Sequence, residues 1–142
     1  MSHVLHWHPA VNVYLSAKYE RVLEGQRETV SVHIRVPTAV DNETLSFGQR
    51  RLPTMGWYMH VMEHKFDPTK VVFMIFAEST TALAPLMAAM QSRVSGLEYE
   101  LVDESCALSL ALMSKCKHHV FGASAFGFWG AFDVCDCVWT FV

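Results

Sequence analysis

The first residues that could do chemistry lie near the end of a β-branched run. The segment 29–36, TVSVHIRV, alternates apolar residues with polar ones, and the polar set includes His33 and Arg35. In a strand that is covered on both faces, such polar side chains need partners. A guanidinium at a strand end beside a helix N-terminus forms an anion clamp, because it is a planar fork of donors that stays charged. An ion pair, for example with Glu78 or Asp103, is the alternative, and the sequence leaves both open.

A second candidate is the stretch HHVFGASAFGFWGAF, residues 118–132. Its apolar start ends in a turn of small residues, Gly122 and Ala123, which leaves room for a ligand to approach the backbone. A helix beginning at Ser124 would direct free N–H groups and a positive dipole end at that ligand. This arrangement suits a phosphate. The alternative is that the small residues only permit a tight turn between strand and helix.

Metal chemistry has weaker support in the sequence. No pair of aspartates follows a strand to hold a metal diphosphate, so we expect no essential divalent ion and no metal ligands at this site. The G-x-G-x-x-G dinucleotide fingerprint does not occur. Neighbouring residues of a strand point to opposite faces, so His118 and His119 are not expected to share a zinc ion. The four cysteines fit no standard zinc spacing with them; they are Cys106, Cys116, Cys135 and Cys137.

Length and charge limit the class of protein. The chain has 142 residues, which is enough for one domain with a single core. Its net charge is −3 with neutral histidines, which gives no electrostatic case for binding nucleic acid. No apolar run approaches the length of a membrane helix, and the N-terminus does not have the pattern of a signal peptide. We therefore expect the chain as given to be soluble.

The elements that must position these residues alternate along the chain. Strand and helix signals follow one another at least three times, which predicts an α/β fold with a Rossmann-like parallel sheet and flanking helices. Ligands of such sheets bind beyond the carboxyl ends of the strands. We expect Ser79 or Thr80 to cap the second helix, which Pro85 interrupts. The predicted strands are 30–36, 70–77, 98–102 and 118–122, and the predicted helices are 51–66, 79–94, 105–116 and 124–132.

Three blocks of the sequence resemble those of the α-1,2-fucosyltransferases, the galactoside 2-α-L-fucosyltransferase family. VSVHIR (30–35) matches the first six positions of the family's Val-x-Val-His-x-Arg-Arg-Gly-Asp block. VVFMIFAES (71–79) has the shape of its second block, a buried strand that ends near an acidic pair. LMSKCKHHVFGASAFGFWGAF (112–132) matches the third block closely. The similarity covers residues 30–132.

This resemblance implies a function. The donor would be GDP-fucose, the acceptor would be a glycan ending in galactose, and the sugar would move to the 2-hydroxyl of that galactose with inversion and without a cofactor. Residues 1–142 would form a single domain equivalent to the C-terminal, donor-binding half of a GT-B-type glycosyltransferase. The first half and the Golgi membrane anchor of animal members are missing from the chain. A missing N-terminal half-domain, or an unknown partner, would have to complete the enzyme.

The resemblance also assigns roles to residues. Arg35 would clamp the phosphates and stabilise the departing GDP, which makes it the candidate catalytic residue. The expected donor-binding residues are His33, Arg35, Glu78, Ser124, Ala125 and Phe126.

Departures from the family pattern favour a second interpretation. Val36, Pro37 and Thr38 stand where the family has Arg, Gly and Asp, and Ala125 stands where it has Thr. Each loss removes a charge or a hydrogen-bonding group, and one charge-assisted contact contributes about 1.5–3 kcal/mol. The chain could therefore be an impaired transferase. It could also be a non-catalytic half-domain, a pseudoenzyme that binds a nucleotide or a partner.

Overall fold

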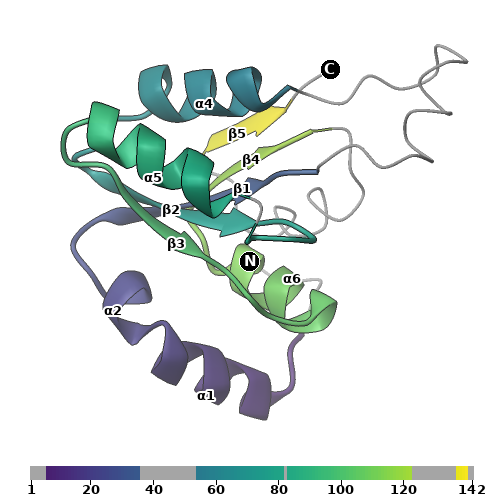
Figure 1. Ribbon diagram of the computed structural model, residues 1–142. Helices are drawn as coiled ribbons and strands as arrows, with labels where there is room; N and C mark the ends of the chain where they lie inside the picture. The colour runs from purple at the N-terminus through teal and green to yellow at the C-terminus, as the bar shows by residue number, and fades with distance from the viewer. Residues whose placement is uncertain (1–5, 36–53, 82, 123–136, 141–142) are drawn as a thin grey trace, which may run out of the picture.

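The fold is a parallel β-sheet with helices on both faces (Figure 1). The computed structural model describes residues 6–35, 54–81, 83–122 and 137–140. In these ranges no helix has both the length and the apolar character needed to span a bilayer. The elements are α1 (Pro9–Lys18), α2 (Glu20–Leu23), β1 (Glu28–His33), α4 (Met55–His64), β2 (Val71–Phe76), α5 (Ala84–Arg93), β3 (Glu98–Leu101), α6 (Cys106–Ser114), β4 (His118–Phe121) and β5 (Cys137–Thr140).

The order of the strands defines a point at which the winding of the chain reverses. The order in the sheet is β3-β2-β1-β4-β5, and every neighbouring pair is parallel. The chain therefore builds outward from β1 through β2 to β3, returns to place β4 on the other side of β1, and continues to β5. The four predicted strands and their parallel arrangement are confirmed, and β5 adds a fifth strand that the sequence did not indicate. In doubly wound sheets, ligands bind outside the carboxyl ends of the strands at such a reversal.

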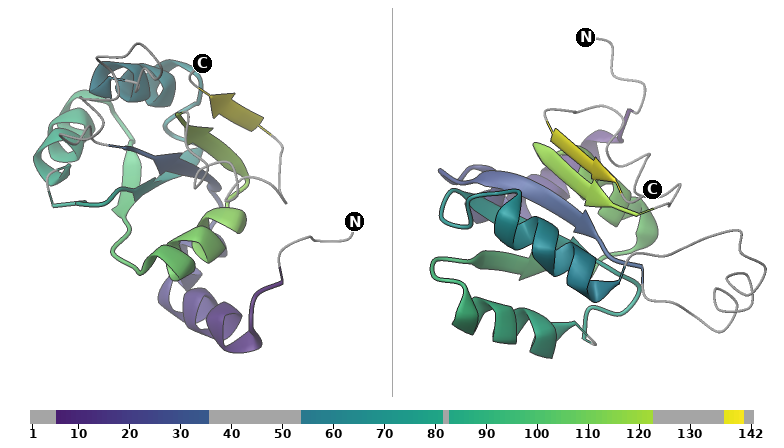
Figure 2. Two further views of the ribbon diagram at one scale, coloured as in Figure 1. Left: turned by 90° about the vertical axis from the view of Figure 1, so that its right-hand side faces the viewer. Right: turned by 90° about the horizontal axis from the view of Figure 1, so that it is seen from above.

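The helices α4 and α5 cover the face of the sheet that holds the larger core (Figures 1 and 2). Alternate residues of each strand point to this face, as the period of two requires. Removing each large apolar side chain from water stabilises the fold by about 1.5–3 kcal/mol. The buried residues here are Val30, Val32, Ile34, Tyr58, Val61, Met62, Val71, Phe73, Ile75, Leu83, Met87, Met90, Leu97 and Val120.

The opposite face is covered by α1 and α6. Its core includes Leu15 of α1 and Leu112 of α6, which pack against Met74 and Phe76 of β2. The indole Nε1 of Trp7 also donates a hydrogen bond of 3.2 Å to Ser114 Oγ at the end of α6. The sequence patterns had not indicated α1 and α2.

A carboxylate after β3 fixes α1 to this layer. Glu104 has a side chain that is only 5% exposed, and it accepts hydrogen bonds from Lys18 Nζ at 2.6 Å and Tyr19 Oη at 2.9 Å. Tyr14 Oη donates to both of its oxygens at 3.2 Å. Two turns of α1 are thereby attached to the loop that leads into α6.

The bounds of α6 agree with the prediction within two residues, whereas α4 and α5 begin later than predicted. Helix α4 begins at Met55 and not at 51, because Thr54 is extended and caps it. Helix α5 begins at Ala84, five residues later than the predicted start, and neither Ser79 nor Thr80 caps it. The reason is Pro85, which lies in the first turn. A proline has no N–H and a fixed φ, so it is well suited to start a helix and poorly suited to continue one. The predicted helix 124–132 lies outside the described residues.

Candidate functional site

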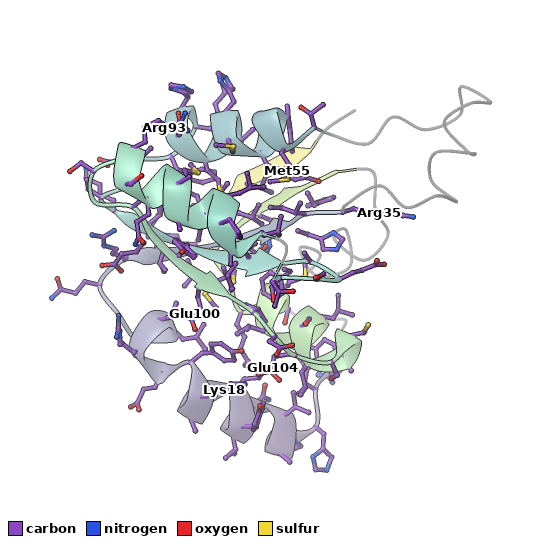
Figure 3. The ribbon with its side chains drawn as sticks, in the orientation of Figure 1. Lys18, Arg35, Met55, Arg93, Glu100 and Glu104 are labelled. Atoms are coloured by element: carbon purple, nitrogen blue, oxygen red, sulfur yellow. The ribbon has the colours of Figure 1, made fainter. Side chains whose placement is uncertain are left out.

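The candidate site is the carboxyl edge of the sheet where β1, β2 and β4 end. His33, the last residue of β1, is the Cα partner of Phe76 in β2 and of Phe121 in β4. Arg35 and Glu78 each lie two residues beyond these paired positions. The register thus brings both predicted residues to one edge, and Figure 3 shows the Arg35 side chain projecting outward from the end of β1.

Ile34, the residue after β1, extends the hydrogen-bond ladder at this edge. The backbone N–H of Ile34 donates to the carbonyl of Phe76 at 2.8 Å, so the ladder continues one residue past the strand. Ile34 is 1% exposed and anchors the chain in the core immediately before Arg35. Arg35 is itself half-buried, whereas Glu78 lies exposed in the bend after β2.

His33 is an uncharged group next to a charged one. Burial lowers its pKa to about 4, and the positive charge of Arg35 contributes to the same shift. At pH 7 the imidazole is therefore neutral. A pKa so far below the working pH makes a weak general base, so His33 is better suited to hydrogen bonding than to proton abstraction.

Tyr58 is a residue of this edge that the sequence did not single out. It is buried on α4 and lies beside the backbone of Arg35. Burial raises the pKa of its hydroxyl to about 12, and the Arg35 backbone offsets a part of this rise. The helical spacing of apolar residues in 51–66 predicted that one face of this helix is buried. It did not indicate which strand end that face contacts.

A buried hydrogen bond joins the two strands on either side of the winding reversal. Ser31 and His119 are Cα partners in β1 and β4, and Ser31 Oγ lies 2.8 Å from His119 Nδ1. Both residues are buried, with 1% and 0% of their surface exposed. The alternation in 29–36 predicted that its polar side chains need partners, and for Ser31 the partner is His119. The bond holds β1, which leads to Arg35, against β4, which leads to the 124–126 segment.

As predicted, the side chains of the adjacent residues His118 and His119 point to different faces of the sheet. His118 Nε2 lies 2.8 Å from Glu28 Oε2 and its ring is 5.8 Å from that of Phe66, whereas His119 faces Ser31. They do not converge on a shared ion. Cys137 lies opposite His118 in β5, and Cys135 lies outside the described residues.

Three of the described helices, α4, α5 and α6, begin at the carboxyl edge of the sheet because each follows a parallel strand. Thr54 caps α4 by accepting from the N–H of Trp57 at 3.2 Å, and Ser105 caps α6 by accepting from the N–H of Leu108 at 3.4 Å. The remaining N-terminal N–H groups of these helices point toward this edge. Ser124, Ala125 and Phe126, the other predicted donor-binding residues, lie outside the described residues.

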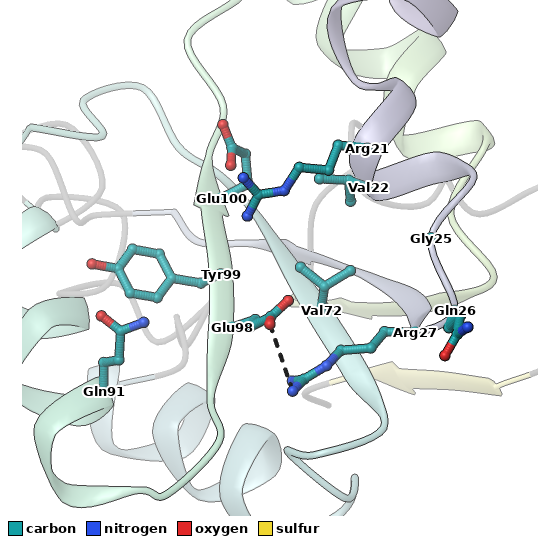
Figure 4. A pocket seen from close by; sticks show the side chains of 10 residues that line it. All are labelled: Arg21, Val22, Gly25, Gln26, Arg27, Val72, Gln91, Glu98, Tyr99 and Glu100. Carbon is teal, nitrogen blue, oxygen red and sulfur yellow. Dashed lines mark ion pairs between the residues drawn. The ribbon is translucent and has the colours of Figure 1, made fainter.

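A cavity of about 540 Å³ lies elsewhere, between β3 and the α2–β1 connection (Figure 4). Its charged side chains face one another: Arg27 forms a 3.6 Å ion pair with Glu98, and Arg21 points toward Glu100. Arg27 also donates to the carbonyls of Gly96 and Pro68 at 2.7 and 3.0 Å. Because these groups already balance each other, we assign the cavity no part in anion binding. Its lining is Arg21, Val22, Gly25, Gln26, Arg27, Val72, Gln91, Glu98, Tyr99 and Glu100.

The order of the parallel strands and the two helix layers define a Rossmann-like α/β fold. Among solved structures, the chain is similar to fucosyltransferase NodZ from Bradyrhizobium, with a TM-score of 0.56 and 15% sequence identity over 89% of this chain and 43% of NodZ. NodZ α-1,6-fucosyltransferase co-crystallised with GDP gives a TM-score of 0.56, and the same enzyme soaked with GDP-fucose gives 0.54. Both of these are 15% identical to the chain and are matched over 42% of their own length, with 89% of this chain covered.

The chain therefore spans less than half the length of the solved structures it matches. No family model matches it, and no curated protein matches it. The similarity confirms the predicted fold class.

Proposed function

We propose that this chain is the donor-binding half of a fucosyltransferase and that it binds GDP-fucose at the carboxyl edge of the sheet. The observation that carries this proposal is the reversal of winding between β1 and β4, with Arg35 two residues past the end of β1. A guanidinium there suits a diphosphate, since it offers charge and a fork of donors together. The NodZ structures with GDP or GDP-fucose support the choice of nucleotide.

In the proposed reaction, the acceptor hydroxyl oxygen attacks the anomeric carbon of fucose from the face opposite the nucleotide. The bond from this carbon to the phosphate oxygen breaks, GDP leaves with the electron pair, and the proton of the acceptor hydroxyl passes to water. Arg35, together with the backbone N–H groups of the helix that the sequence predicts from Ser124 through Ala125 and Phe126, stabilises the charge that develops on GDP. Neutral His33 serves as a hydrogen-bonding group next to this charge, in keeping with its pKa of about 4.

We further propose that the acceptor ends in galactose and that the new linkage is α-1,2, in the Golgi. The sequence blocks 30–35, 71–79 and 112–132 support this specificity, because they resemble those of the galactoside 2-α-L-fucosyltransferases. The solved neighbours include an α-1,6 enzyme, so product linkage is a necessary part of any activity assay. The glycosidic linkage of a labelled product, determined by NMR, decides between the two.

A second candidate function is nucleotide binding without transfer. One observation favours it: Val36, Pro37 and Thr38 replace the Arg, Gly and Asp of the family block. An inverting transfer needs the donor held in attack geometry, and the loss of polar groups beside the diphosphate would weaken that hold.

The experiment is a calorimetric titration of GDP into the purified chain, followed by a transfer assay with GDP-fucose and a β-galactoside. Arg35→Ala should weaken GDP binding about 10- to 150-fold, which corresponds to the loss of one charged contact. Arg21→Ala is the matched control, because it removes an arginine from the cavity and leaves the strand ends intact. Binding with transfer supports the first function, and binding without transfer supports the second. Absence of GDP binding, or its loss in Arg21→Ala but not in Arg35→Ala, contradicts the proposed site.

A further inference from the structure

Helix α4 carries two histidines side by side on its solvent face. His60 and His64 are one turn apart, their ring centres are 4.6 Å apart, and the ring planes are inclined by 48°. Both residues are exposed, and the His64 side chain is 59% exposed. The core side of the same helix is formed by Tyr58, Val61 and Met62. The pair therefore lies on the exposed side of α4, away from the core.

We propose that His60 and His64 together bind a divalent transition-metal ion, with Zn²⁺ as the ion to test. Imidazole nitrogens suit Zn²⁺, Ni²⁺ and Cu²⁺. With Zn–N bonds of about 2.0–2.1 Å and a tetrahedral angle, two imidazoles on one ion have ring centres about 5 Å apart. The observed 4.6 Å is close to this value, so the two rings already have about the spacing that a shared ion requires.

Glu63 adds negative charge beside this pair. Its Oε2 lies 3.7 Å from His64 Nε2, and its other oxygen is engaged by Arg93 of α5. The order His-x-x-Glu-His on a helix also occurs in a class of zinc peptidases. Here Arg93 forms an ion pair with Glu63. The described part of the chain also has no group of three or more His, Cys, Asp or Glu that could hold a metal ion. The site therefore supplies two protein ligands, with water at the other positions, and it is not a peptidase centre.

The metal site lies away from the candidate donor site. α4 begins near the carboxyl edge at Met55, and the histidines are in its second half. Arg93, which contacts Glu63, lies at the end of the helix layer opposite Met55 and Arg35 (Figure 3). A bound ion would link one turn of α4 without contacting the nucleotide. The inference does not depend on the proposed transferase function.

The test is a calorimetric titration of Zn²⁺ into untagged, metal-stripped protein, with His60→Gln and His64→Gln as variants. His6→Gln is the control, because His6 is another exposed histidine. We expect Zn²⁺ affinity to fall at least tenfold in either α4 variant and to stay unchanged in the control. Zn²⁺ should also raise the melting temperature of the unchanged chain, and it should shift the imidazole NMR signals of both α4 histidines. Retained affinity in either α4 variant, or no Zn²⁺-dependent shift of these two imidazole signals, overturns the proposal.

Discussion

Removing the carboxylate of Glu104 should detach α1 from the rest of the fold. The side chain of Glu104 is only 5% exposed and accepts hydrogen bonds from Tyr14, Lys18 and Tyr19, which lie on two turns of one helical segment. The substitution Glu104→Ala deletes all of these acceptors at once. Because the partners are 85 to 90 residues away in sequence, the effect must act through tertiary structure.

The loss of stability in Glu104→Ala depends on which of the former hydrogen-bond donors can be hydrated instead. Lys18 is 46% exposed, so its ammonium group is rehydrated and contributes little. Tyr19 is 5% exposed and loses its charged partner, and a hydrogen bond to a charged group contributes about 1.5–3 kcal/mol. We therefore expect a loss of about 2–3 kcal/mol in the free energy of unfolding. For a chain of this size this lowers the melting temperature by about 6–12 °C.

The assay is urea and thermal unfolding followed by circular dichroism, combined with hydrogen exchange of the α1 amides. Glu100→Ala is the matched control, since Glu100 is an exposed glutamate four residues earlier. In a double-mutant cycle, Glu104→Ala should be much less destabilising when Tyr19→Phe is already present. Equal losses with and without Tyr19→Phe, or a loss no larger than that of Glu100→Ala, would refute the reasoning.

Acid pH should weaken the same contact. Burial alone would raise the pKa of Glu104, but the hydrogen bonds from Lys18 and Tyr19 together outweigh it and hold the pKa below the ordinary value of 4.5. A carboxyl with a lowered folded pKa stabilises the protein above its unfolded pKa. This stabilisation is lost as the pH falls below about 4.5 through the folded value. Glu104→Ala should remove that part of the acid dependence.

Three further predictions concern the candidate site. The triple variant Val36→Arg, Pro37→Gly, Thr38→Asp should bind GDP at least tenfold more tightly than the unchanged chain, because charged groups return next to the diphosphate. If calorimetry gives equal GDP affinities for the two folded proteins, the proposed site is contradicted. GDP affinity should be the same in excess EDTA, and a strict need for Mg²⁺ or Mn²⁺ would contradict a metal-free site. His33 has a folded pKa of about 4 against an ordinary 6.5, so the unfolded state binds more protons between these values and stability should fall as the pH drops through this window. His33→Gln should flatten this part of the profile, and an unchanged slope in urea unfolding would disprove the assignment.

Local patterns in the sequence determined most of the elements and the position of one strand end. The all-apolar run at β2, buried at every position, predicted a strand covered on both faces. The alternation through β1 predicted which residues face the core and placed Arg35 at the strand end. These features depend on side-chain period and on neighbours within a few residues, so sequence alone carries them. The helix α1 left a weaker signal, in which Val11, Leu15 and Tyr19 repeat every four residues after a proline in the first turn.

Tertiary structure decided which strands meet and which polar groups become partners. The insertion of β4 beside β1 creates the winding reversal, and Arg35 lies two residues past the end of β1 at this point. The Ser31–His119 bond joins positions 88 apart, and Glu104 meets Tyr19 across 85 residues. Such contacts form only when the strands and helices pack into the complete tertiary structure. The pattern around each residue shows that it needs a partner, whereas the shared packing of distant segments determines which partner it finds.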